Sequence, residues 1–206
     1  MREQPILFSA PMVRAILNSR KTMTRRMKGL KEINKHPSHW SFEGLLENGL
    51  FKFRHRISDC WMEIKCPYGA PGNSLWVRET WYCDDPAAAQ DAMSRMKGVY
   101  FKATEVAPHL FKWRPSIFMP RWASRITLEI TGVRIERLKD ISEEDAEAEG
   151  CEPQAWATDK KDIDGENVEI FSAVPTFSLL WDSINGKIYP WASNPWVWVI
   201  EFKKEV

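Results

Sequence analysis

The sequence WVWVIEF, residues 196–202, carries the clearest fold signal in the chain. Apolar side chains occupy both parities of this segment, with Trp196 and Trp198 on one face and Val197 and Val199 on the other. Since successive side chains of a strand point to opposite faces, such a segment is apolar on both sides and suits the interior of a sheet. We therefore predict that residues 196–202 form a central strand.

Further strand and helix patterns lie on the N-terminal side of this segment. Short apolar or alternating runs predict strands at residues 5–8, 51–57, 61–64, 74–79, 98–103 and 126–135. Apolar spacing and capping residues predict helices at residues 9–17, 142–149 and 177–184. The helices do not alternate regularly with the strands, as they would in a parallel α/β sheet. The pattern predicts an α+β fold, a mixed β-barrel with about three short helices.

Two regions are expected to stand apart from this core. Residues 84–120 are weakly patterned and are expected to form a long insertion that contains the strand at 98–103. Residues 152–170 are polar and acidic and are expected to form a surface loop. The whole chain of 206 residues is expected to form one domain, since a chain of this size buries enough surface to fold without disulfides or metal.

Composition excludes several classes of protein. The 29 basic and 28 acidic residues give a net charge of +1, which excludes a histone-like polycation. Aromatic residues make up 12% of the chain, which excludes a disordered protein. No apolar run approaches the roughly 20 residues that cross a bilayer, and the N-terminus lacks the apolar core of a signal peptide. We expect a soluble, cytoplasmic protein that does not interact with membranes.

The cysteines give no metal or disulfide signature. Cys60, Cys66, Cys83 and Cys151 are irregularly spaced, with no Cys-x-x-Cys pair. Ordinary reduced thiols are the favoured interpretation. We expect neither a metal nor an organic cofactor.

Charge is distributed unevenly along the chain. Residues 1–35 contain nine basic and two acidic side chains, whereas residues 140–170 contain twelve acidic and two basic ones. The basic segment includes RKTMTRR at residues 20–26. It forms a loop or the start of a strand after the first helix, and its charge is either solvated, held against the acidic segment, or presented to phosphate.

Several motifs in a fixed order resemble the ASCH domain, a member of the PUA-like superfamily, in its phage- and prophage-encoded branch. These motifs are PILFSAPMVRAIL, KTMTRR, LWVRETW, MPRWASRI and ISEEDAEAEG. The family with defined chemistry that is similar to this chain is the bacterial N(4)-acetylcytidine amidohydrolase. The resemblance implies a PUA-like barrel and hydrolysis of an acyl group from a modified cytidine-like base.

The resemblance also implies the site residues. The K-T-x-T-x-R motif of the amidohydrolase falls on Lys21, Thr22, Thr24 and Arg26, and its catalytic glutamate falls on Glu149. Lys21, Thr24 and Glu149 are therefore the expected catalytic residues. At the remaining motif position, Arg25 replaces an apolar residue of the relative.

Amide hydrolysis is chemistry that these side chains could perform. Thr24 offers a hydroxyl nucleophile, Lys21 is a base once its pKa falls, and Glu149 gives a proton to the leaving nitrogen or orients Lys21. The alternative is that Glu149 is one of several interchangeable carboxylates on a solvated helix. The other expected substrate-binding residues are Thr22, Arg25, Arg26, Arg78 and Glu79, although Arg78 and Glu79 could instead pair with each other.

Two further function classes remain open from the sequence. A non-catalytic module would bind a nucleoside or nucleic acid, RNA more readily than DNA, through basic and aromatic side chains. A phage accessory protein would instead engage a host factor, with the acidic segment at residues 140–170 as a mimic of nucleic acid.

Overall fold

The computed structural model describes residues 2–83, 98–105, 112–161 and 167–205. The chain divides into two compact units. The first comprises Met1–Ser19, Tyr68–Thr131 and Phe202–Val206, and the second comprises Arg20–Pro67 and Gly132–Glu201. Strands β9 (Thr127–Arg137) and β12 (Trp196–Lys204) each contribute residues to both units.

The first unit contains the predicted N-terminal strand and helix. Strand β1 (Glu3–Leu7) pairs in parallel with β6 (Ser74–Arg78), and β6 pairs antiparallel with β9. Helix α1 (Ala10–Leu17) follows β1, with Pro11 in its first turn and Val13 and Ile16 buried. Ser9 occupies the N-cap position as predicted, but its side chain makes no capping hydrogen bond.

A small antiparallel pair follows in the same unit. Strand β7 (Trp81–Cys83) pairs with β8 (Val99–Phe101), which confirms the strand predicted within the insertion. Their buried side chains form a core with Met119 and Ala123. Residues 84–97 and 106–111 of the predicted insertion lie outside the described residues.

The second unit is organised around β12. It pairs antiparallel with β2 (Met23–Arg26), with Ile200 opposite Thr24 and Val199 opposite Arg25. Residues 196–200 are buried on both parities, which confirms the prediction of a strand covered on both faces. Val197 and Val199 contribute to a core that also contains Met23, Phe177 and Trp181.

A three-stranded antiparallel sheet covers the face of β12 that carries Trp196 and Trp198. It consists of β3 (Trp40–Leu45), β4 (Phe51–His55) and β5 (Trp61–Ile64). The ring of Phe51 lies 4.7 Å from that of Trp198, and the ring of Phe53 lies 5.2 Å from that of Trp196. The predicted hairpin of β4 and β5 is confirmed, whereas β3 was not predicted.

Two helices pack in the second unit. Helix α2 (Glu143–Ala148) begins as predicted, because the Ser142 hydroxyl accepts a hydrogen bond from the backbone N–H of Asp145. Helix α3 (Val174–Asn185) buries Phe177 and Trp181. Glu143 joins the two, since its carboxylate accepts hydrogen bonds from the Ser172 hydroxyl and the Ala173 backbone N–H.

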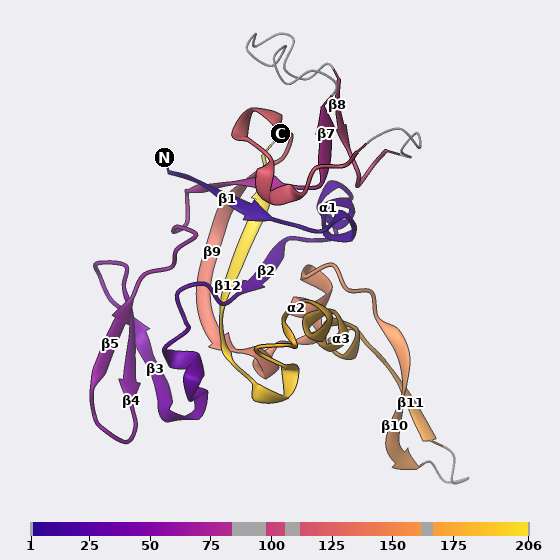
Figure 1. Ribbon diagram of the computed structural model, residues 1–206. Coiled ribbons are helices and arrows are strands. Elements are labelled where there is room, and N and C mark those ends of the chain that lie inside the picture. The colour runs from indigo at the N-terminus through magenta and orange to yellow at the C-terminus, as the bar shows by residue number, and fades with distance from the viewer. Residues whose placement is uncertain (1, 84–97, 106–111, 162–166, 206) are drawn as a thin grey trace. The chain divides into compact units, whose positions relative to one another are not determined.

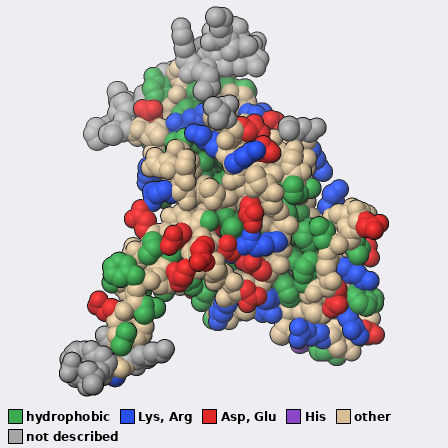
Figure 2. All heavy atoms as spheres, turned by 180° about the vertical axis from the view of Figure 1, so that it is seen from behind, with side chains coloured by type: hydrophobic (Ala, Val, Ile, Leu, Met, Phe, Trp, Pro, Cys, Tyr) green, Lys and Arg blue, Asp and Glu red, His purple; other side chains and the backbone are tan. Residues whose placement is uncertain are grey.

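The prediction of an acidic loop at residues 152–170 is wrong. This region forms an antiparallel hairpin of β10 (Gln154–Lys161) and β11 (Asn167–Ser172), which extends from α2 and α3 in Figure 1. Its register places Trp156 opposite Ile170 and Ala155 opposite Phe171, and such cross-strand apolar pairs stabilise a sheet. Hydrophobic side chains reach the surface along the hairpin (Figure 2), with Phe171 79% exposed.

The fold is mixed α+β, as predicted, but its sheets are open. The largest has the strand order β1-β6-β9-β12-β2, with β1 and β2 as its edges, and the others have two or three strands. Among the described residues no sheet closes into the predicted barrel. Within the same residues, no helix has both the length and the apolar character needed to cross a membrane.

Candidate functional site

A buried ion pair joins Lys21 to Glu149 within the second unit. The Nζ atom of Lys21 lies 2.6 Å from Oε2 of Glu149 and donates to its backbone carbonyl at 2.7 Å. Lys21 is 2% exposed and Glu149 4% exposed. The solvated-loop interpretation of Lys21 and the solvated-helix interpretation of Glu149 are therefore wrong.

The backbone of two distant segments brings this pair together. The N–H of Thr22 donates to the carbonyl of Ala148 at 2.9 Å, so the chain entering β2 lies along the end of α2. Glu149 is the C-cap residue of α2, where backbone carbonyls lack partners within the helix. The Lys21 ammonium satisfies one of these carbonyls and places positive charge at the helix C-terminus, which is favourable.

The surroundings of the pair shift the pKa values of two groups. Burial lowers the pKa of Lys21 below its ordinary value, and although contact with Glu149 opposes this effect, the nearby charge of Arg26 adds to it. Burial, with a contribution from the Glu149 charge, raises the pKa of the Cys151 thiol to about 11. The site therefore combines a lysine whose neutral amine form is favoured by burial and a thiol that stays protonated near neutral pH.

Arg25 links the pair to a wider set of carboxylates. Its guanidinium donates to Glu136 at 2.5 and 3.0 Å, to Asp145 at 2.6 Å and to Oε1 of Glu149 at 3.4 Å. It also lies over the ring of Phe177 at 5.6 Å. Arg134 contacts Glu136 at 3.2 Å and also pairs with Asp145 and Glu201. The sequence indicates Asp145 only as a position in the cap of the helix at residues 142–149, and it gives Glu136 and Arg134 no role in the site.

The remaining motif residues lie on or beside β2. Because side chains alternate along a strand, Thr24 and Arg26 occupy the face opposite Met23 and Arg25. Thr24 is buried, Arg26 is half-buried and Thr22 is exposed. Among the described contacts, none joins the Thr24 hydroxyl to Lys21 or Glu149.

Arg78 and Glu79 belong to the first unit, and they do not pair with each other. Arg78 donates from Nε to the carbonyl of Met119 at 2.9 Å. Glu79 is buried and accepts two hydrogen bonds from Arg125, at 2.9 and 3.1 Å. Burial raises the pKa of Glu79, although Arg125 opposes the shift. The interpretation of Arg78 and Glu79 as an ion pair is therefore wrong.

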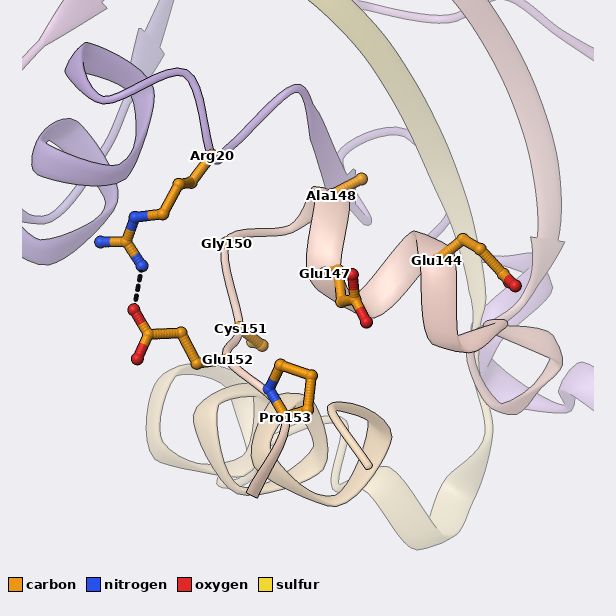
Figure 3. Close-up of a pocket in the computed structure, with 8 residues that line it drawn as sticks. All are labelled: Arg20, Glu144, Glu147, Ala148, Gly150, Cys151, Glu152 and Pro153. Atoms are coloured by element: carbon orange, nitrogen blue, oxygen red, sulfur yellow. Dashed lines mark hydrogen bonds and ion pairs between the residues drawn. The ribbon is translucent and has the colours of Figure 1, made fainter. Parts of the chain in front are cut away.

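A pocket of about 430 Å³ is lined by residues next to Lys21 and Glu149 in the chain (Figure 3). Its lining includes the residues adjacent to both partners, Arg20 on one side and Ala148 and Gly150 on the other. Figure 3 shows Arg20 and Glu152 joined by an ion pair at one side of the pocket, with Glu147 and Glu144 along α2. The volume lies within the range of roughly 300–1,000 Å³ that is typical of small-molecule sites.

The four cysteines are free thiols, as predicted. In the described ranges, no three His, Cys, Asp or Glu side chains gather in a way that could hold a metal ion. No family model, curated protein or solved structure matches this chain.

Proposed function

We propose that this chain is an ASCH-type protein of the PUA-like superfamily that hydrolyses an N-acyl group from a cytidine-like base. The observation that carries the proposal is the buried contact of 2.6 Å between Nζ of Lys21 and Oε2 of Glu149. It joins two of the three residues that the sequence resemblance assigns to catalysis, across 128 residues of chain.

A proton moving within this pair would create both groups that amide hydrolysis requires. Transfer from Nζ of Lys21 to Oε2 of Glu149 converts an ammonium and a carboxylate into a neutral amine and a carboxylic acid. Burial favours the neutral amine of Lys21, because a charged group loses its hydration in a protein interior. The amine is then a general base and the acid is a proton donor, without any proton taken from solvent.

The proposed reaction has two steps through Thr24. In the first, Lys21 takes the proton of the Thr24 hydroxyl while Oγ1 bonds to the acyl carbon, the C–N bond breaks, and Glu149 protonates the leaving nitrogen. In the second, a water gives its proton to Glu149 and its oxygen attacks the ester, and Thr24 leaves with the proton held by Lys21. Thr24 shares a face of β2 with Arg26, whose charge acts on Lys21.

The pocket beside the pair is the proposed substrate site. Its lining residues flank Lys21 and Glu149, and its volume of about 430 Å³ suits a single nucleoside. Since the side chain of Lys21 is fully covered, substrate binding has to open a path from this pocket to Nζ. Thr22, which is exposed just before β2, is the proposed contact at this entrance.

A panel of N-acylated nucleosides and short acylated RNAs tests the proposal. Each is incubated with the wild type and with Lys21→Ala, and mass spectrometry follows loss of the acyl group. Lys35→Ala is the matched control, because Lys35 forms an ion pair of the same length, 2.6 Å, with Glu32 on the surface. We expect acyl loss with the wild type and Lys35→Ala only. Equal acyl loss with Lys21→Ala, or none with any protein, would contradict the proposal.

Binding of a nucleoside or RNA without hydrolysis would favour the alternative function, a non-catalytic nucleic-acid-binding module. Lys28 is exposed next to β2 and could contact phosphate. In that case Lys28→Ala would weaken RNA binding and reduce its salt dependence, while Thr24→Ala would leave binding unchanged.

A further inference from the structure

The Arg25 guanidinium is fully enclosed and engaged with protein groups. Its side chain has no exposed surface, although the residue lies within the most basic stretch of the chain. Nε and Nη2 donate to Glu136, Nη2 also donates to Asp145, and Nη1 contacts Glu149 and the sulfur of Met23. The substrate-binding role expected from the sequence therefore conflicts with this geometry, because no face of Arg25 is turned to solvent.

The two oxygens of the Glu149 carboxylate have different partners. Oε2 lies 2.6 Å from Nζ of Lys21, and Oε1 lies 3.4 Å from Nη1 of Arg25. Arg25 is itself held by Glu136 and Asp145, which fix the plane of its guanidinium. Oε1 of Glu149 thus contacts the Arg25 guanidinium, which cannot rotate freely, while Oε2 contacts Lys21.

We propose that Arg25 is a positioning residue for the proposed hydrolysis, which holds Oε1 of Glu149 so that Oε2 stays aligned with Nζ of Lys21. This inference rests on the proposed function and reassigns Arg25 from substrate contact to support of the catalytic pair. A planar guanidinium is suited to this task, because it presents several donors in fixed directions, whereas a lysine ammonium contacts its partners as a single point charge.

Arg134 provides a matched control within the same network. It contacts Glu136, Asp145 and Glu201, so it shares two of the three carboxylates of Arg25, and none of the contacts described for it is to Glu149. Arg25→Lys and Arg134→Lys therefore perturb the same carboxylates and retain the charge. Only Arg25→Lys removes the contact between the guanidinium and Oε1 of Glu149.

The test compares kcat, KM and melting temperature for these two variants on the substrate found in the panel. We expect Arg25→Lys to lower kcat on the order of 100-fold with little change in KM, since a misplacement of about 1 Å costs this much. We expect Arg134→Lys to lower the melting temperature without this loss of kcat. A raised KM with unchanged kcat in Arg25→Lys would restore the substrate-binding role. A loss of kcat that is equal in both variants would reduce Arg25 to a stabilising residue.

A measurement without substrate separates this inference from the proposed function. Nitrogen-15 NMR of lysine side chains resolves a buried ammonium that exchanges slowly with water, and Lys21→Met identifies the Lys21 signal. The signal should shift or broaden in Arg25→Lys and remain in place in Arg134→Lys. An unchanged Lys21 signal in Arg25→Lys would overturn the inference, whether or not the wild type hydrolyses any substrate. Should Arg25→Lys fail to fold, Arg25→Gln, which keeps a neutral donor, is compared in the same way.

Discussion

Nζ of Lys21 lies between the carboxylate and the backbone carbonyl of Glu149, at 2.6 and 2.7 Å, with both side chains removed from water. The ammonium of Lys21, in the basic segment at residues 20–26, thus contacts Glu149 at the end of helix α2 twice. A buried ion pair of this kind does not by itself increase stability, because its desolvation offsets its attraction. Its contact of 2.6 Å places the two groups within hydrogen-bond distance, which the proposed proton transfer requires.

Removing one partner of the pair should be far more destabilising than removing its surface counterpart. Lys21→Ala leaves the Glu149 carboxylate buried without its ammonium, which typically costs about 3–5 kcal/mol. Lys35→Ala breaks an exposed pair with Glu32 and should stay within about 0.5 kcal/mol of the wild type. Urea unfolding of both variants measures the difference. Similar free energies of unfolding for the two variants would show that the Lys21–Glu149 pair is not buried in solution.

Stability should depend on pH through Lys21. Its pKa in the folded protein is lowered, chiefly by burial, while the unfolded chain holds the proton up to about pH 10.5. In the window between these values the unfolded state binds more protons, so the free energy of unfolding rises with pH. Relative to the double variant Lys21→Met/Glu149→Gln, the wild type should become more stable from pH 7 to pH 10. A difference that shrinks over this range would contradict the lowered pKa.

The thiol of Cys151 should be unreactive near neutral pH. With a pKa of about 11, raised chiefly by burial, it is ionised to about one part in a thousand at pH 8, and only the thiolate is alkylated readily. Cys60 is exposed and serves as the internal control. Iodoacetamide labelling, followed by mass spectrometry of the peptides, should modify Cys60 at least 100-fold faster than Cys151 (an order-of-magnitude expectation from the thiolate fraction and burial). Equal rates at the two sites would contradict the burial of Cys151.

Helix α2 should depend on its N-cap. The Ser142 hydroxyl accepts the N–H of Asp145 at 3.1 Å, and replacing such a cap by alanine costs about 1 kcal/mol. Ser142→Ala should therefore lower the free energy of unfolding by this amount, whereas Ser183→Ala, at an exposed position of α3, should change it less. A Ser142→Ala variant as stable as the wild type would show that the cap makes no net contribution.

The local sequence pattern predicts an element correctly where the residues that define the element are close together in the chain. Apolar side chains on both faces of residues 196–202 predict β12, and the spacing of Ser142 and Asp145 predicts the start of α2. Neither signal depends on residues distant in the chain. The choice of Glu149 among the neighbouring carboxylates came from the family resemblance, since Glu143, Glu144 and Glu147 look equivalent in the sequence and yet are exposed.

The sequence-based predictions that are wrong depend on contacts that the local sequence does not reveal. Arg25 reads as one more cation of a basic stretch, because its partners Glu136 and Asp145 lie 111 and 120 residues away. The β10–β11 hairpin was hidden by its polar composition, although the pairs it forms across the strands, such as Trp156 with Ile170, are apolar. Strand β3 was missed because its pairing with β4 shifts register between Phe42 and Gly44, which breaks the alternation.

The proposed function requires Lys21 and Glu149 to exchange a proton during acyl hydrolysis. The most direct measurement is kcat/KM of Glu149→Gln on the substrate found in the panel, beside Glu32→Gln as the exposed control. Glutamine keeps the size of Glu149 and its contact with Lys21 but cannot accept and return the proton. We expect a loss on the order of 1,000-fold for Glu149→Gln, as is typical of a general acid–base residue, and wild-type values for Glu32→Gln. A Glu149→Gln variant within about threefold of the wild type would contradict the proposed function.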